Sequence, residues 1–217
     1  MYSATFNEDV INFASHFVGS FTPFTIKKEA LKLKGVKNYR IHLNEAEKTE
    51  FIIKLHAELD KAMSMIFVNK KDSATKLQAR LATKQVVSNI LIGGIENKDR
   101  DRIIDDFRKQ QFNCLISTNV LARGIDVPEV DLVINYDVPF VKECGFMNPD
   151  YANFMHRVGR TGRFGTDGLS LTISTDEIEE EAVDLIAKHY EIDITELKSF
   201  EDLKGIFEEM RGSLLEK

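Results

Sequence analysis

Cysteine is scarce in this chain of 217 residues, which has only Cys114 and Cys144. Two thiols without metal-ligand spacing make neither a disulfide framework nor a zinc site, so we expect a reducing compartment and no metal ligands. A run of about 18 apolar residues is missing as well, and Met1 is not followed by a basic segment and an apolar core. We therefore expect neither a membrane span nor a signal peptide.

Acidic charge is concentrated at one end of the chain. The formal net charge is -6, yet residues 176–217 hold 14 acidic and 5 basic side chains, which leaves +3 for the first 175 residues. This mildly basic body permits an RNA partner without requiring one. The run from residue 177 to residue 186 is predicted to be a helix with a solvated acidic face, and a regulatory acidic patch is the alternative. The side chains predicted to turn inward are Ile178, Ala182, Leu185 and Ile186.

Short apolar, β-branched runs alternate with amphipathic segments. Strands are predicted at 36–43, 63–68, 86–92, 113–118, 130–136 and 169–174, and helices at 45–61, 71–84, 97–110, 176–190 and 200–212, with a short helix near 148–155. The helix at 97–110 is predicted to be capped by Asn97. Alternation of this kind predicts βαβ units, and hence a parallel sheet with helices on both faces.

Residues 156–165, HRVGRTGRFG, hold three arginines and three glycines. A helix interior disfavours this composition, because Gly costs about 1 kcal/mol there relative to Ala. The planar guanidinium suits bidentate contact with phosphate, and glycine lets backbone approach a ligand closely. Taken alone, the stretch fits a solvated basic turn as well as a phosphate-facing turn.

A second candidate loop, residues 117–130, follows the predicted strand at 113–118. In parallel sheets ligands bind beyond the carboxyl ends of the strands, where this loop is expected to lie. Asp126 fits a ribose-binding carboxylate, or an ordinary turn residue, because Gly-Ile-Asp before Pro128 also favours a turn. Gly124 allows the loop to pass close to a ligand.

Four segments stand in an order and spacing that match one family. They are SAT (3–5), MIFVNK (65–70), TNVLARGID (118–126) and HRVGRTGR (156–163). They resemble motifs III, IV, V and VI of the DEAD-box RNA helicases, and the resemblance extends to about residue 175. It implies a RecA-like three-layer αβα domain, with a mainly parallel sheet and helices on both faces.

The same resemblance implies that this chain carries half of an active site. Residues 1–24 would be the end of a first RecA-like domain and a linker, and residues 25–217 the second domain, with 176–217 as its acidic helical part. In the family, the first domain supplies a phosphate loop and the Asp-Glu-Ala-Asp box that holds Mg²⁺. This sequence contains neither GxxxxGK[ST] nor DEAD. The chain is expected to act on ATP with that domain in cis, and to be inactive alone.

Roles for individual residues come from the matching motif positions. Arg160 and Arg163 are expected to act as arginine fingers on the γ-phosphate, where charge spreads in the transition state. Nucleotide binding is expected at Gly124, Asp126, Arg160 and Arg163. Contacts to single-stranded RNA are expected at Asn69, Arg100, Thr118 and Arg123. Coupling between the two domains is expected at Ser3, Thr5 and His156.

Departures from the family pattern fall on the RNA side. The family usually has His-Gly-Asp before Gln-x-x-Arg, whereas this chain reads IGGIENKDR. The departing residues are Ile92, Gly94 and Asn97, and Arg100 is kept. Lys70 also stands where motif IV often has Thr. These changes bear on the RNA contacts and not on the ATP contacts.

The connection between NYDVP (135–139) and His156 is 16 residues long, whereas most family members use about seven. A longer loop with Asn-Pro-Asp resembles the branch that releases mRNA from its proteins at the cytoplasmic face of the nuclear pore. This implies a monomer of cytoplasm and nucleus whose partners are nuclear-pore and export-activator proteins. The alternative is a non-catalytic RecA-like docking module, which would not need Arg160, Arg163 and Asp126.

Overall fold

The computed structural model describes residues 16, 35–59, 62–119, 130–143, 145–162 and 167–215. Two compact units divide the chain, Met1–Lys32 and Leu33–Lys217. The fold described below is that of the second unit. Among the described residues, no helix has both the length and the apolar character needed to cross a membrane.

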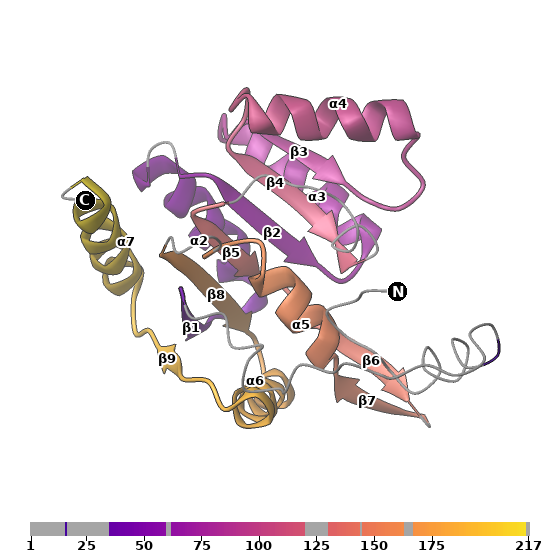
Figure 1. The fold of residues 1–217 in the computed structure, drawn as a ribbon, viewed down its shortest axis with the longest axis vertical. Coiled ribbons are helices and arrows are strands. Elements are labelled where there is room, and N and C mark those ends of the chain that lie inside the picture. The colour runs from indigo at the N-terminus through magenta and orange to yellow at the C-terminus, as the bar shows by residue number, and fades with distance from the viewer. Residues whose placement is uncertain are drawn as a thin grey trace. The chain divides into compact units, whose positions relative to one another are not determined.

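Seven parallel strands form the central sheet in the order β3-β4-β2-β5-β8-β1-β9 (Figure 1). Their bounds are β1 Val36–His42, β2 Ser64–Val68, β3 Ser88–Leu91, β4 Cys114–Thr118, β5 Leu132–Asn135, β8 Gly168–Ser174 and β9 Ile194–Glu196. A separate antiparallel hairpin joins β6 (Phe140–Glu143) to β7 (Phe146–Pro149). The short strands β3 and β9 are the two edges of the sheet.

Six helices cover the sheet in two layers. Their bounds are α2 Glu45–Glu58, α3 Lys71–Thr83, α4 Asn97–Arg108, α5 Tyr151–Val158, α6 Glu177–Tyr190 and α7 Phe200–Leu215. Strand side chains alternate between the faces: Ile66 and Val68 pack in the cluster with α2, α3 and α7, while Met65 and Phe67 pack against α4. The helices α5 and α6 pack on the same face as α4, through Phe154 and the residues around it.

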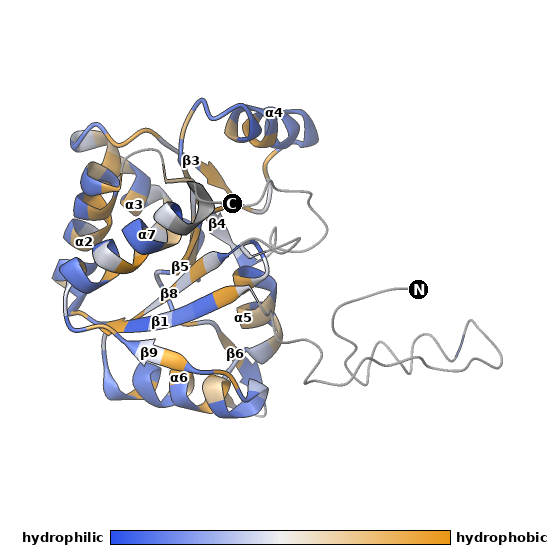
Figure 2. Ribbon diagram, turned by 60° about the vertical axis from the view of Figure 1, so that its left-hand side comes forward, coloured by the Kyte–Doolittle hydropathy of each residue, from blue (hydrophilic) through white to orange (hydrophobic). Residues whose placement is uncertain are grey.

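The hydrophobic pattern explains these layers. Strands β2, β4, β5 and β8 are buried along their whole length, as expected for parallel strands covered on both faces. Each helix instead buries one stripe, and Figure 2 shows hydrophilic colouring on much of the outer surface of α2 and α4. The core therefore consists of two apolar layers, one on each side of the sheet.

The fold class and all six predicted strands are confirmed, with ends shifted by at most two residues. The cap prediction at Asn97 was wrong: Asn97 is the first helical residue, and Glu96 stands at the N-cap without a side-chain hydrogen bond. Ile178 and Leu185 were also predicted wrongly, because they are 67% and 40% exposed. The helix α6 turns inward through Ala182, Val183, Ile186 and Tyr190 instead.

Candidate functional site

The seven strands are parallel, so their carboxyl ends all lie on one side of the sheet, where ligands of such folds bind. This side is called the carboxyl edge, as distinct from the edge strands β3 and β9. Five predicted site residues lie within the described residues: Asn69, Arg100, Thr118, His156 and Arg160. The others lie outside them: Ser3, Thr5, Arg123, Gly124, Asp126 and Arg163. The roles predicted for this second group stay predictions.

The helix α5 carries His156 and Arg157 of the His-Arg-x-Gly-Arg stretch, and Arg160 lies in the turn after it. Its N-cap residue Asp150 accepts a hydrogen bond from the backbone N–H of Asn153 at 2.9 Å, which satisfies an otherwise orphan donor of the first turn. At the other end, His156 is half-buried and Arg160 is only 8% exposed. A solvated basic turn does not fit this burial of Arg160.

The turn after α5 is tied to the start of β5. The backbone N–H of Val130 donates to the carbonyl of Arg160 at 3.2 Å, and the buried hydroxyl of Thr161 donates to the carbonyl of Val130. Gly162 then adopts a φ of +66° against Val36. A side chain would be strained at this φ and would meet Val36, so glycine is required where the chain turns toward Arg163.

Arg157, the arginine beside His156, is fully buried and bonds the ends of three strands. Its Nε donates to Oδ1 of Asn119 at 2.8 Å, and its Nη2 donates to Oδ1 of Asn69 at 2.9 Å. Its Nη1 donates to the carbonyl of Asp137 at 2.7 Å and to Oδ1 of Asn135 at 3.3 Å. The guanidinium also lies 5.3 Å from the ring centroid of Phe67. One side chain thus connects the ends of β2, β4 and β5 to α5.

Both ends of the segment 120–129, which carries Arg123, Gly124 and Asp126, are bonded to α5 or to the turn that follows it. Before the segment, Asn119 accepts from Arg157; after it, the backbone N–H of Val130 donates to Arg160. The two residues that flank this segment, Asn119 and Val130, are therefore both bonded to α5 or to the turn after it.

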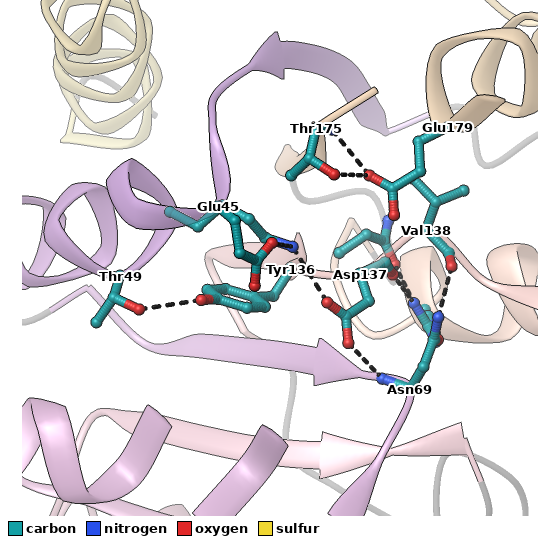
Figure 3. Close-up of polar contacts among 11 residues, drawn as sticks. Glu45, Thr49, Asn69, Tyr136, Asp137, Val138, Thr175 and Glu179 are labelled. Carbon is teal, nitrogen blue, oxygen red and sulfur yellow. Dashed lines mark hydrogen bonds and ion pairs between the residues drawn. The ribbon is translucent and has the colours of Figure 1, made fainter. Parts of the chain in front are cut away.

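Asn69 follows β2 and is held from three directions. Its backbone N–H donates to Oδ2 of Asp137 at 2.7 Å, its Nδ2 donates to the carbonyl of Val138 at 2.8 Å, and its Oδ1 accepts from Arg157 (Figure 3). The residue is nonetheless exposed. Its amide oxygen is bonded to Arg157 and one N–H of Nδ2 to Val138, so the second N–H of Nδ2 is left without a partner among the described residues.

Two polar atoms of the predicted RNA contacts are buried without a hydrogen-bond partner. One is Oγ1 of Thr118, whose residue is 4% exposed at the end of β4. The other is Nε of Arg100, whose nearest carboxylate oxygen, on Asp101, lies 3.8 Å away. Buried side-chain atoms of the same kind occur elsewhere among the described residues, on Asn38, Ser88 and Ser170, so the feature does not by itself mark a ligand site.

A buried ion pair between Lys48 and Asp137 supports the position of Asn69. The ammonium of Lys48, whose side chain is 2% exposed, lies 3.2 Å from the carboxylate of Asp137 and 3.4 Å from that of Glu45. Burial alone would lower the pKa of Lys48, but the carboxylates of Asp137 and Glu45 outweigh it and raise that pKa. Lys48 therefore stays charged and fixes Asp137, which in turn orients the backbone of Asn69.

A metal-binding cluster is not found among the described residues, which hold no group of three His, Cys, Asp or Glu side chains in suitable positions. The acidic side chains near the site are occupied in other ways. Asp137 accepts hydrogen bonds from Lys48 and Asn69, and Glu179 accepts from the hydroxyl and backbone N–H of Thr175 (Figure 3). The described edge supplies cations and donors rather than metal ligands.

Sequence reasoning missed the residues that organise the edge: Lys48, Asn119, Asn135, Asp137 and Arg157. Their partners lie up to 89 positions apart in the chain. A usable signal existed for the two asparagines, because Asn119 directly follows one predicted strand and Asn135 is the next-to-last residue of another.

A protein-family comparison decides which fold this is. The model for the helicase conserved C-terminal domain matches residues 47–165, which is more than half of the chain. The chain belongs to the helicase C-terminal domain family. The matched span contains Lys48, Asn69, Arg100, Thr118, Arg157 and Arg160.

Relatives of this helicase domain are DEAD-box RNA helicases. The chain is 40% identical over 194 residues to the "ATP-dependent RNA helicase DBP5" of Lodderomyces elongisporus, covering 89% of this chain and 37% of that protein. The first curated relatives are all much longer, and the chain spans about two fifths of their length.

Solved structures agree with the fold. S. cerevisiae Dbp5 bound to RNA and ADP BeF3 superposes with a TM-score of 0.86 at 32% identity, covering 96% of this chain and 54% of that chain. The C-terminal domain of the DEAD-box protein Dbp5 superposes with a TM-score of 0.74 at 34% identity, covering 82% of this chain and 99% of that chain. The predicted RecA-like fold and the predicted resemblance are confirmed.

Proposed function

We propose that this helicase domain is the second RecA-like domain of an ATP-dependent RNA helicase, in which it supplies arginine fingers and contacts to the RNA backbone. Residues 1–24 would then belong to the end of the first domain and the linker. The proposal is supported by the relatives, which are named ATP-dependent RNA helicases, and by one observation of geometry. Both ends of the segment 120–129 are bonded to α5 or its following turn, at Arg157 and Arg160.

The residues present fit a nucleotide that is bound across two domains. Arg160 and Arg163 would contact the terminal phosphate, Asp126 the ribose hydroxyl, and Gly124 the space beside the sugar. ATP would supply the phosphoryl group, and the first domain would hold its Mg²⁺. The contribution of this chain is fixed positive charge, which the guanidinium of arginine provides in a planar, always protonated form.

RNA would lie along the ends of β2, β3 and β4. Asn69 offers an amide N–H there, and Arg100 and Thr118 stand at the positions that match the RNA contacts of the family. Arg123 would add a second charge. Contacts of this kind bind the sugar-phosphate backbone and carry no direct information on base sequence.

The partners in the solved Dbp5 complexes support a role in mRNA export. S. cerevisiae Dbp5 has been solved with Gle1 and IP6, and with Nup159, Gle1, IP6 and ADP. We propose equivalent nuclear-pore and export-activator partners for this protein, and hence a place at the cytoplasmic face of the pore. Binding of Gle1 and IP6 to this chain, measured by calorimetry, tests this part separately.

The test of the enzymatic proposal joins the N-terminal portion of S. cerevisiae Dbp5, up to the aligned segment, to this chain. We expect RNA-stimulated ATP hydrolysis by the joined protein, none by this chain alone, and loss of turnover on Arg160→Ala. Arg80→Ala is the matched control, because Arg80 is an exposed arginine of α3 that pairs with Glu50. A folded joined protein that binds partners but never hydrolyses ATP would support the docking-module alternative.

A further inference from the structure

The guanidinium of Arg157 is the largest fully buried side chain described, with 0% exposure. Four of its hydrogen bonds go to neutral oxygens, on Asn69, Asn119, Asn135 and the Asp137 backbone. Burial lowers the pKa of Arg157 to about 9, with Asp137 and Asp150 opposing the shift. The side chain is therefore still cationic at neutral pH, and oriented amide and carbonyl dipoles take the place of water around it.

Complete burial excludes direct contact with a ligand. Any effect of Arg157 on binding must pass through the groups that it holds. Two of those groups, on Asn69 and Asn119, stand at the ends of β2 and β4, where the predicted RNA contacts Asn69 and Thr118 lie.

The Arg157 contact fixes which atom Asn69 presents to solvent. An amide can rotate to exchange its oxygen and its nitrogen, and the two orientations offer opposite hydrogen-bonding character. In the observed orientation the oxygen accepts from Arg157 and the nitrogen donates to Val138. The reverse orientation would set N–H groups against the guanidinium and oxygen against the carbonyl of Val138. The exposed side of Asn69 is thus held as a donor, which is the character that a phosphate oxygen needs.

The bond to Asn119 acts on the second strand. Asn119 follows Thr118 directly and precedes the segment 120–129, which carries Arg123, Gly124 and Asp126. The Nε of Arg157 holds it at 2.8 Å. The guanidinium that sets the amide of Asn69 therefore also sets the start of this loop.

We propose that Arg157 is a positioning residue for RNA: it holds Asn69 as a hydrogen-bond donor and Asn119 in place, so that the ends of β2 and β4 meet the RNA backbone together. This inference rests on the proposed function, since it concerns the same RNA-binding edge. It assigns a role in binding to a residue that no ligand touches.

Titration of the whole chain with single-stranded oligouridylate, followed by NMR at several salt concentrations, tests the proposal. The wild-type chain should bind weakly, near 10⁻⁴ M, with a salt slope between one and two, because Arg100 and Arg123 would each contribute about 0.7. Arg157→Lys keeps the charge but cannot reach four divergent acceptors. We expect it to weaken binding about fivefold, as one misplaced hydrogen bond would, with an unchanged salt slope.

Two control variants separate the explanations. Arg100→Gln should weaken binding and lower the slope by about 0.7, as a direct phosphate contact does. Phe207 lies in the buried face of α7, away from the predicted RNA contacts. Phe207→Leu should lower the free energy of unfolding and leave RNA affinity intact. An Arg157→Lys variant that binds RNA like the wild type would overturn the proposal, and so would one whose slope falls.

A second variant tests the donor directly and does not depend on the folding of Arg157→Lys. Asn69→Asp keeps an oxygen for Arg157 but removes both N–H groups of Nδ2, including the one bonded to Val138, and adds a negative charge, so it should lose most RNA binding. Wild-type affinity in Asn69→Asp would overturn the proposal. A wild-type chain with no detectable RNA binding would instead contradict the proposed function itself, which keeps the two failures distinct.

Discussion

The ammonium of Lys48 lies 3.2 Å from the carboxylate of Asp137, with Lys48 almost fully buried and Asp137 holding the backbone of Asn69 (Figure 3). We expect Asp137→Asn to lower the free energy of unfolding by about 3 kcal/mol, because it leaves the Lys48 charge buried beside only the exposed Glu45. Urea denaturation at pH 7 measures this. Lys54→Met, which removes an exposed pair with Glu201, should cost less than about 1 kcal/mol. Equal losses in the two variants would contradict the assigned role.

His56 makes the protein sensitive to acid. Burial lowers the pKa of His56 to about 4, and its Nε2 lies 3.1 Å from the hydroxyl of Ser64. The unfolded chain binds a proton near pH 6.5 and the folded chain only near pH 4, so stability is present above 6.5 and is lost between these values. The loss should reach up to about 3 kcal/mol. Urea denaturation from pH 7 to pH 4 measures it.

His56→Gln should reduce the loss of unfolding free energy between pH 7 and pH 4. His42→Gln is the matched control, because His42 is exposed and pairs with Glu180. If His56→Gln loses as much stability on acidification as the wild type, the loss is caused by other titratable groups.

Gly162 should tolerate no side chain. Its φ of +66° is strained for other residues, and a Cβ would stand 2.5 Å from Cγ2 of Val36 and 3.0 Å from the backbone of Gly35. Gly162→Ala is expected to cost about 3 kcal/mol. Gly145→Ala shares a positive φ but has open space around it, so it should cost about 1 kcal/mol. Thermal unfolding of both variants compares strain with and without the collision.

The helix α6 presents an exposed side where the sequence pattern placed a buried one. Ile178→Lys should change the free energy of unfolding by less than about 0.5 kcal/mol, since Ile178 is 67% exposed. Ile186→Ala should cost about 3 kcal/mol, because Ile186 is fully buried. Chemical denaturation of both variants shows which face of α6 is packed, and a large loss in Ile178→Lys would contradict the structure.

Arg163 is expected to act in the transition state of ATP hydrolysis. In the joined two-domain protein, Arg163→Ala should lower kcat by roughly 10³-fold or more while leaving KM for ATP nearly unchanged. Arg163→Lys should rescue poorly, because a point charge cannot reproduce the planar fork. Steady-state kinetics with saturating RNA measure both. A loss confined to KM would assign Arg163 to ground-state binding of the nucleotide.

The local hydrophobic pattern predicted the strands correctly where every residue of the strand is buried. Strands such as β2 and β4 are apolar on both faces, so composition alone marks them. The hydrophobic pattern gave the wrong result for Ile178 and Leu185. Apolar residues occur on more than one side of α6, so the sequence fits two rotations of the helix about its axis, and the observed one turns Val183 and Tyr190 inward. The hairpin of β6 and β7 was missed because its four-residue strands are mostly exposed.

Arg157 shows why part of the site stayed hidden. Its three asparagine partners, Asn69, Asn119 and Asn135, are distant in sequence and meet only because parallel strands end at one edge. An arginine in a glycine-rich stretch is normally expected to face solvent or a ligand. An arginine can be completely buried only if the fold supplies enough oxygen acceptors for its N–H groups. The number of such acceptors cannot be read from the arginine and its sequence neighbours alone.

The two edge strands bear on aggregation. An exposed edge can add a strand from another copy of the chain, and short or blocked edges resist this. Here β9 pairs over three residues only. On β3, the side chain of Gln78 donates to the carbonyl of Ser88, and the side chain of Asn89 accepts from the backbone N–H of Ile90. Both edge strands thus resist the addition of a further strand, β9 because it is short and β3 because side chains occupy two of its backbone groups.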